Sequence, residues 1–240
     1  MKKTNKLAAL LLTSLTLMTG CNGKGKEITK DEAQDVLAGI VEESKEIYKE
    51  GKLSFTADAE IVSKIDGNES VMKTELEYDA DNEALYVKSY IKDANTTVEL
   101  EYYCGMKDGD YYYFDEMKDE YYKVEGDAGK ALWATNAEYL TFPATTSAKI
   151  LPALTGLIAS EEEGVTYYSS GEGNLYIEYK AEEAGATAEV IYQFKDNLVT
   201  KEYVKATDGN GNEMTSDANL KYRASVKLPS TKNYTEKTAF

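Results

Sequence analysis

The sequence predicts an α+β protein built mainly from one antiparallel β-sheet. Two long stretches, 53–125 and 165–228, alternate apolar and polar residues with the period of a β-strand. One amphipathic helix is expected before the first stretch, and a helical insertion of about 127–163 separates the two. Because no repeat of fixed period and no linker divides these segments, residues 28–229 are predicted to form a single domain.

The N-terminal helix is predicted by its start signal and its apolar stripe. Thr29-Lys30-Asp31-Glu32 fits a capping box, in which the threonine and the glutamate satisfy each other's backbone N–H groups. Gly51 stands where a left-handed helix end is expected. Apolar residues follow the box at helical spacing: Ala33, Val36, Leu37, Ile40, Val41, Ile47 and Tyr48. We expect this stripe to cover the sheet.

About 11 strands are expected from the alternating segments and the polar turns between them. Asp66-Gly67-Asn68 and Asp208-Gly209-Asn210-Gly211 are typical hairpin turns. Such connections give antiparallel neighbours, and an antiparallel sheet can have one face in water. The expected strands are 53–61, 72–78, 85–91, 96–106, 111–115, 121–125, 165–169, 174–180, 186–195, 198–207 and 219–228.

The helical insertion carries two apolar stripes. Pro143 is expected to separate them, and Pro152 to open or kink the second helix. Two interpretations remain: the stripes complete the core, or they line an apolar pocket against the sheet. The stripes are Leu132, Trp133, Asn136, Ala137 and Leu140, then Ile150, Leu151, Leu154, Leu157 and Ile158.

The N-terminus has the pattern of an export signal. Lys2, Lys3 and Lys6 precede an apolar run from Leu7 to Leu17. This run is shorter than the roughly 20 apolar residues that a membrane-spanning helix needs. Residues 1–20 are therefore predicted to be a signal peptide.

Leu17-Met18-Thr19-Gly20-Cys21 resembles the bacterial lipoprotein signal. The resemblance implies cleavage before Cys21, a diacylglycerol on its sulfur, and a lipidated tether over residues 21–27. Two or more acyl chains anchor a protein stably, so the protein is expected on the extracytoplasmic face of the cell membrane. The alternative is an ordinary secretory signal with a chance cysteine.

Composition excludes several classes of function. The net charge of −16 repels phosphate backbones and argues against nucleic acid as a partner. The chain has no histidine, which removes Ser-His and Cys-His nucleophile pairs and histidine-bearing zinc sites. Paired carboxylates could serve a glycosidase, but no acidic residue stands in a context that marks it. We therefore predict no enzyme, no catalytic residue, no metal site and no cofactor.

Two local features have simpler interpretations than a site. Asp208 to Glu213 is similar to the start of a calcium loop, but it has Glu213 where glycine is needed and Asn219 in place of the twelfth-position glutamate. A plain hairpin is favoured. Cys104 lies in an alternating strand pattern and is interpreted as a small buried apolar residue.

Tyrosine is unusually frequent, with 20 Tyr against 5 Phe. Adjacent pairs such as Tyr102-Tyr103 point to opposite faces of a strand, so they do not form one platform. Tyrosine is favoured on a sheet surface that is partly exposed to solvent. The alternative interpretation is a face on which sugars stack.

The order of anchor, helix, meander, helical insertion and further strands resembles the LolA/LolB-like superfamily of envelope lipoproteins, including the LppX/LprG-like group. The resemblance implies a curved, open half-barrel sheet covered by helices, with a hydrophobic cavity between. It predicts a non-enzymatic protein that binds or carries an apolar or lipid-like ligand. The ligand-binding residues expected on this hypothesis are Ile40, Phe55, Leu76, Val87, Trp133, Leu140, Leu154 and Ile158.

The alternative is a surface module that binds polysaccharide or a protein partner through Tyr-rich strands and acidic loops. In either case residues 230–240 are expected to be a loose tail.

Overall fold

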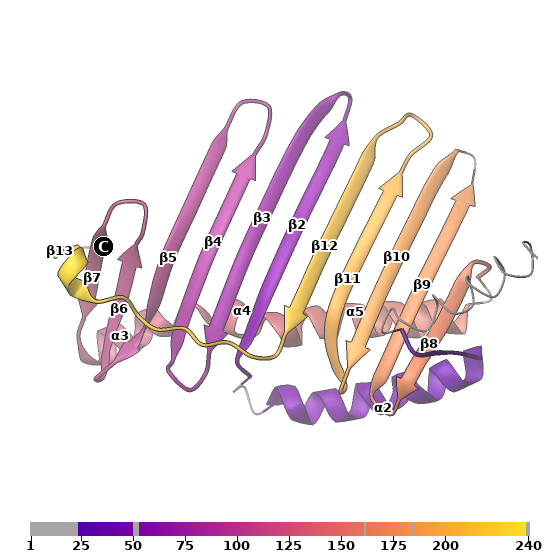
Figure 1. Ribbon diagram of the computed structural model, residues 1–240, viewed down its shortest axis with the longest axis horizontal. Coiled ribbons are helices and arrows are strands. Elements are labelled where there is room, and N and C mark those ends of the chain that lie inside the picture. The colour runs from indigo at the N-terminus through magenta and orange to yellow at the C-terminus, as the bar shows by residue number, and fades with distance from the viewer. Residues whose placement is uncertain (1–23, 50–52, 161, 184, 239–240) are drawn as a thin grey trace, which may run out of the picture.

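The computed structural model describes residues 24–49, 53–160, 162–183 and 185–238. These residues form one open, curved sheet of 13 strands with helices on one face (Figure 1). All neighbouring strands are antiparallel except β13 and β7, so the predicted fold class is confirmed. The predicted signal peptide, Cys21 and Gly51 lie outside the described residues.

Two meanders make up the sheet. The first runs from β2 to β7 and the second from β8 to β12, and they join where β12 pairs with β2. The order across the sheet is β1-β8-β9-β10-β11-β12-β2-β3-β4-β5-β6-β7-β13. The strands of the first meander are β2 (Phe55–Ile65), β3 (Asn68–Asp79), β4 (Ala84–Lys92), β5 (Thr97–Lys107), β6 (Asp110–Asp115) and β7 (Glu120–Val124). Those of the second are β8 (Val165–Gly171), β9 (Asn174–Glu183), β10 (Ala186–Lys195), β11 (Leu198–Thr207) and β12 (Glu213–Lys221).

Helix α2 (Lys30–Lys49) begins at the predicted capping box. The Thr29 N–H donates to Glu32 Oε2 at 2.8 Å, and the Glu32 N–H donates to Thr29 Oγ1 at 3.3 Å. Three of the four residues that α2 buries belong to the predicted stripe, namely Ala33, Leu37 and Ile40. The fourth, Ser44, was not predicted and lies on the same helix face as Ile40. The helix lies along the lower ends of the strands of the second meander (Figure 1).

The insertion forms α3 (Gly126–Ala134), α4 (Ala137–Leu140) and α5 (Phe142–Ala159), within the predicted range. Pro143 is not the separator that the sequence suggests: it occupies the first turn of α5, where its missing N–H costs nothing. Pro152 lies inside α5. None of the described helices has the length and apolarity that crossing a membrane requires.

The tether prediction for residues 21–27 is wrong at its end, because strand β1 (Lys26–Ile28) pairs with β8. Gly25 makes this approach possible: its φ is +87°, and a Cβ there would lie 2.3 Å from the Ser169 carbonyl oxygen. Lys24 Nζ also forms an ion pair with Glu178 at 2.8 Å.

The prediction of a loose tail over residues 230–240 is wrong as well. A 3-10 turn (Thr231–Asn233) leads into strand β13 (Thr235–Lys237), which pairs in parallel with β7. The Tyr234 ring packs edge-on against Phe114, with 5.1 Å between ring centroids. Strands β1 and β13 are the two strands beyond the expected 11.

The last predicted strand, 219–228, is displaced. Strand β12 starts directly after the Asp208 turn, and Glu213 pairs opposite Thr207. Of its helix-facing residues, only Met214 and Leu220 are large and apolar, so the apolar alternation that marks a strand is weak. After Lys221 the chain leaves the sheet and crosses the lower strand ends as an extended segment (Figure 1).

Candidate functional site

Cross-strand pairing assigns every side chain to one of two sheet faces, because directly opposite residues share a face. The face toward the helices contains two fully buried rows at the lower strand ends. One row is Phe55, Tyr78, Leu85 and Cys104, and the next is Ala57, Leu76, Val87 and Tyr102. These rows, together with α2 and α5, form the core.

The same face continues past the helices, where exposed apolar residues lie among the hydroxyl pairs Thr74–Ser89 and Ser63–Ser70. Figure 1 shows the hairpins of β2–β3, β4–β5, β9–β10 and β11–β12 extending well beyond the helix layer. Toward these hairpins lie Met72 opposite Ile91 and Ile91 opposite Val98, at 39%, 45% and 48% exposure. Leu100 is next to them at 39% exposure.

Among the described residues, six of the seven large apolar side chains that are exposed lie on this uncovered part of the sheet. We call them the open apolar face: Ile65, Met72, Ile91, Val98, Leu100 and Met214. The seventh, Met117, lies in the turn between β6 and β7. A contiguous apolar patch on a protein surface marks a place of contact.

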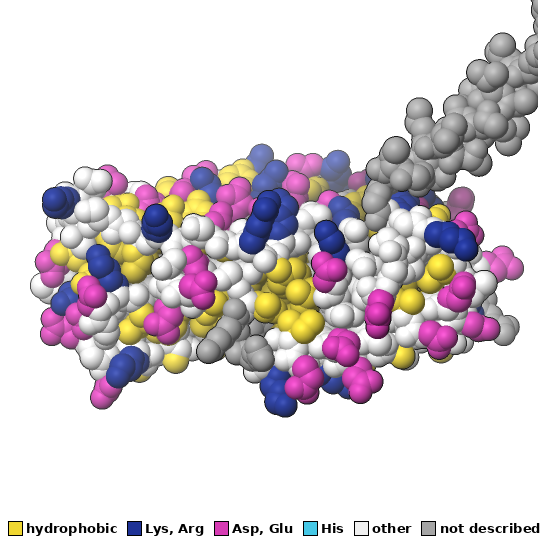
Figure 2. All heavy atoms as spheres, turned by 60° about the horizontal axis from the view of Figure 1, so that its bottom comes forward, with side chains coloured by type: hydrophobic (Ala, Val, Ile, Leu, Met, Phe, Trp, Pro, Cys, Tyr) yellow, Lys and Arg dark blue, Asp and Glu magenta, His cyan; other side chains and the backbone are white. Residues whose placement is uncertain are grey.

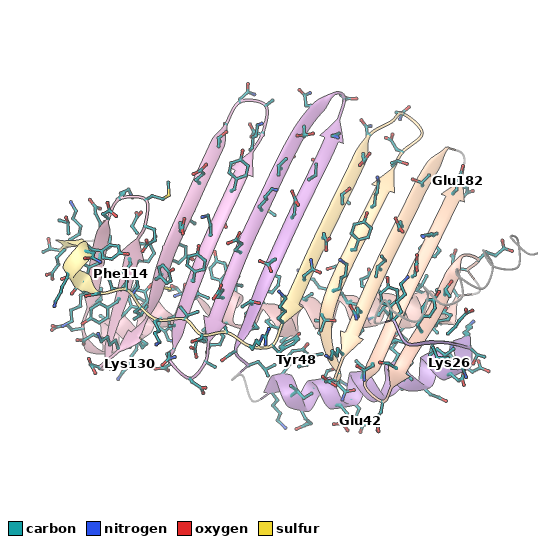
Figure 3. All side chains as sticks on the ribbon, in the orientation of Figure 1. Lys26, Glu42, Tyr48, Phe114, Lys130 and Glu182 are labelled. Carbon is teal, nitrogen blue, oxygen red and sulfur yellow. The ribbon has the colours of Figure 1, made fainter. Side chains whose placement is uncertain are left out.

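The opposite face of the same strands is charged. Lys73 Nζ lies 2.7 Å from Glu60 Oε1, and Lys88 Nζ lies 3.0 Å from Glu101 Oε2. Figure 3 shows these strands carrying polar side chains over their whole length, up to the labelled Glu182 near the tip of β9–β10. This face is therefore the polar, solvent-facing one, whereas six of the seven exposed large apolar residues among those described lie on the other face.

The eight predicted ligand-binding residues do come together in one cluster. Six of them are at most 3% exposed: Ile40, Phe55, Leu76, Val87, Leu154 and Ile158. Trp133 and Leu140 pack against this cluster and are partly buried. The Trp133 ring lies 6.4 Å from that of Tyr78. The insertion thus completes the core, and a ligand-binding role for the eight residues stays a prediction.

Sequence reasoning missed the open apolar face. Met72, Ile91 and Val98 continue the alternation of the strands, so nothing in the local pattern separates them from core residues. The length of the predicted strands is the signal that could have revealed this face. A strand of 11 residues spans roughly 36 Å, whereas one helix covers about 10 Å, so the predicted helices are too few to cover such strands.

A carboxyl group lies at the border of the covered area. Glu202 on β11 points to the helix side, opposite Tyr192 on β10. Burial raises the pKa of Glu202, and the ammonium of Lys149 on α5 lowers it by a smaller amount. Burial and the neighbouring Glu202 carboxylate raise the pKa of Tyr192. This pair brings a carboxyl group to the face that also carries the two hydroxyl pairs.

The two local features of the sequence have structural roles. Cys104 is completely buried, and burial raises the pKa of its thiol to about 12, which leaves it unreactive at neutral pH. Asp208 uses its carboxylate inside the hairpin, where it accepts from the backbone of Asn210 and Asn212 at 2.8 and 2.9 Å. Both outcomes agree with the interpretations favoured by the sequence.

The comparisons with known proteins do not assign the chain to a family. No family model and no curated protein matches it. Among solved structures, it is similar to an uncharacterized conserved protein from Thermus thermophilus, with 10% identity over 87% of this chain and 99% of that one, at a TM-score of 0.28. It is also similar to the S-type phycobiliprotein lyase CPES from Guillardia theta, with 8% identity over 76% and 94% of the two chains, at a TM-score of 0.22. These scores are too low to support an inference about fold or function.

Proposed function

We propose that this protein is a membrane-anchored, extracytoplasmic lipoprotein that binds or carries an apolar or lipid-like ligand without altering it chemically. The observation that carries the proposal is the open apolar face. Six exposed large apolar side chains are gathered on one part of one sheet face. Burying such surface is favourable by roughly 25 cal/mol per Å², so an apolar chain laid across these strands is stabilised.

The open apolar face continues directly into the core. On β4, Val87 is buried and Ile91 is exposed on the same face, with Ser89 between them. A ligand on the open face therefore abuts the helix layer and the buried rows below it. The eight predicted residues would become ligand contacts if the helices separate from the sheet.

Anchoring on Cys21 places this face near a source of lipid. Strand β1 begins at Lys26, five residues after Cys21. Five extended residues span at most about 18 Å. On this proposal the domain stays close to the membrane surface.

Lipid uptake by residues 22–240 tests the proposal. The described sheet and core use no residue before Lys24, so this piece contains the whole described domain. We expect saturable binding of a phospholipid with a fluorescent acyl chain. Val98→Ser together with Leu100→Ser should weaken binding at least ten-fold, whereas Met117→Ser, an equally exposed apolar residue outside the face, should leave it unchanged. Equal binding by both variants would contradict the proposed site.

A surface interaction module is the second candidate. It is favoured by the tight burial of six of the eight predicted ligand contacts, because a closed core of this kind needs no ligand. On this alternative the open apolar face docks a protein partner, or tyrosines of the charged face bind polysaccharide. Tyr86 and Tyr103 lie side by side there, with ring centroids 4.7 Å apart. Absence of any lipid uptake, combined with capture of a glycan, would favour the module.

A further inference from the structure

A second apolar site lies outside the sheet, in the groove between α2 and α5. The groove has two adjoining parts, of about 720 and 380 Å³, which share Val41, Lys45 and Thr155. Volumes of this size are typical of small-molecule sites. Figure 2 shows the side of the molecule on which α2 lies, where apolar side chains appear in gaps between acidic and basic ones.

The smaller part of the groove has mainly apolar walls. Four residues of α2 form one wall: Val41, Ser44, Lys45 and Tyr48. The seven helical rises of 1.5 Å between Val41 and Tyr48 give this wall a length of about 10 Å. The other wall comes from α5. The apolar lining residues are Val41, Ala144, Ala148, Leu151 and Pro152, with the ring of Tyr48.

The charged residues of the groove favour an anionic group at one place. Lys45 is the one charged residue that lines the smaller part, and its ammonium forms no ion pair with a described residue. Glu42 and Glu46 line only the larger part, beyond Lys45. An anionic group is therefore attracted to Lys45 and repelled further along the groove.

A buried hydroxyl group supplies the second, independent observation. Ser147 is 2% exposed and lines the smaller part, and its Oγ has no hydrogen-bond partner among the described residues. Two other hydroxyls of the lining are engaged: Thr155 Oγ1 donates to the Leu151 carbonyl at 2.9 Å, and the Tyr48 hydroxyl pairs with that of Tyr222 at 3.4 Å. An unpaired buried polar group destabilises the fold, and a ligand oxygen at this wall would give the Ser147 hydroxyl a partner.

We propose that the smaller part of the groove binds a single-chain anionic amphiphile, a fatty acid carboxylate, separately from the open apolar face. The carboxylate pairs with the Lys45 ammonium and accepts a hydrogen bond from Ser147. The alkyl chain lies along Leu151, Pro152 and the Tyr48 ring, away from Glu42 and Glu46.

Displacement of 11-(dansylamino)undecanoic acid by laurate tests the proposal on residues 22–240. We expect saturable binding, competition by laurate, and weaker competition by dodecanol and dodecylamine, which have the same chain without the negative charge. Lys45→Glu should weaken laurate binding about ten-fold, because it replaces an attraction with a repulsion. Lys130→Glu on α3 makes the same change of net charge on another exposed helix and should have no effect.

A variant that fills the groove distinguishes binding at this site from binding at the open apolar face. Leu151→Trp should abolish laurate binding without affecting phospholipid uptake, and Val98→Ser with Leu100→Ser should do the reverse. Circular dichroism and the unfolding midpoint show whether Leu151→Trp still folds; if it does not, the pair Lys45→Glu and Lys130→Glu decides alone. Laurate binding that is unaffected by Lys45→Glu, or equal affinity for laurate and dodecylamine, would overturn the proposal. Absence of laurate binding would overturn it too, while leaving the function of the open face standing.

Discussion

Leu100 and Tyr102 point to the same face of β5, two residues apart, yet Leu100 is 39% exposed and Tyr102 is 7% exposed. The edge of the helix layer passes between them. The same step separates Val87 from Ile91 on β4, and Leu76 from Met72 on β3. The helix-facing side of the sheet therefore has two environments, a covered half that forms the core and an open half that is available for binding.

Because of this boundary, the same leucine-to-alanine substitution should lower the free energy of unfolding by different amounts in the two halves. Leu76→Ala removes a side chain that is 3% exposed and should destabilise the domain by about 2–5 kcal/mol. Leu100→Ala should change the free energy of unfolding by only about 0.5 kcal/mol. Urea denaturation of both variants measures the difference. Similar losses would show that the open half is packed in solution.

Asp79 should make stability depend on acidic pH. The carboxylate is buried, and burial favours the neutral form, but hydrogen bonds from Asn82, Val226 and Asp81 outweigh that effect and lower its pKa. Its folded pKa is thus below the unfolded one, so its contribution is complete above the ordinary value near 4 and is lost as the pH falls through the folded pKa. Asp79→Asn should destabilise the domain at pH 7.

The destabilisation by Asp79→Asn should shrink as the pH falls below about 4, where the wild-type carboxyl also becomes neutral. Hydrogen exchange offers a second readout, since the Val226 N–H donates to Asp79 Oδ2 at 3.1 Å and should lose protection in the variant. A loss of stability that is the same at pH 3 and pH 7 would contradict this assignment.

Glu202 should make stability depend on pH with the opposite sign to Asp79. Burial raises its pKa above the unfolded value, so the group favours the folded state at pH values below the ordinary glutamate pKa, and this advantage is lost as the pH rises through the folded pKa. Glu202→Gln should therefore raise the unfolding midpoint at pH 7 and change it little at pH 4. A lower midpoint at pH 7 would mean that the Lys149 ammonium outweighs burial.

The C-terminal segment should stabilise the edge of the sheet at β7 and slow hydrogen exchange there. Tyr234 packs on Phe114, and the Thr235 N–H donates to the Asp119 carbonyl at 2.8 Å. Tyr234→Ala should cost about 0.5–1.5 kcal/mol beyond the lost buried area. It should also speed hydrogen exchange in β7 (Glu120–Val124) while leaving β2 unchanged. Uniform acceleration across the sheet would mean that the segment stabilises the whole domain.

Local patterns were sufficient to predict most of the fold. The Thr29 capping box, the alternation from Phe55 onward and the stripes of the insertion each predict an element that the structure contains. Lys26–Ile28 and Thr235–Lys237 were missed because each is short, has little apolar alternation and is held by a partner distant in sequence. The start of Glu213–Lys221 was missed because its first residues are mostly polar, although the strand pairs with the adjacent β11 as well as with β2.

The candidate sites were harder to predict for a related reason. Which apolar residues are covered depends on where α5 crosses the strands, and no local pattern distinguishes Ile91 from Val87. The groove at Lys45 requires α2 and α5 to lie side by side, although more than 90 residues separate them along the chain. Both sites are properties of packing, whereas the predicted lipoprotein signal at Cys21 is read from the sequence alone.

The most direct measurement is native mass spectrometry of residues 22–240 purified from a lipid-containing host. We expect a reproducible added mass that organic extraction removes and identifies as a lipid, and a reduced fraction of it in Val98→Ser with Leu100→Ser. A protein that carries no added mass and takes up no phospholipid would contradict the proposal that the open apolar face binds an apolar ligand.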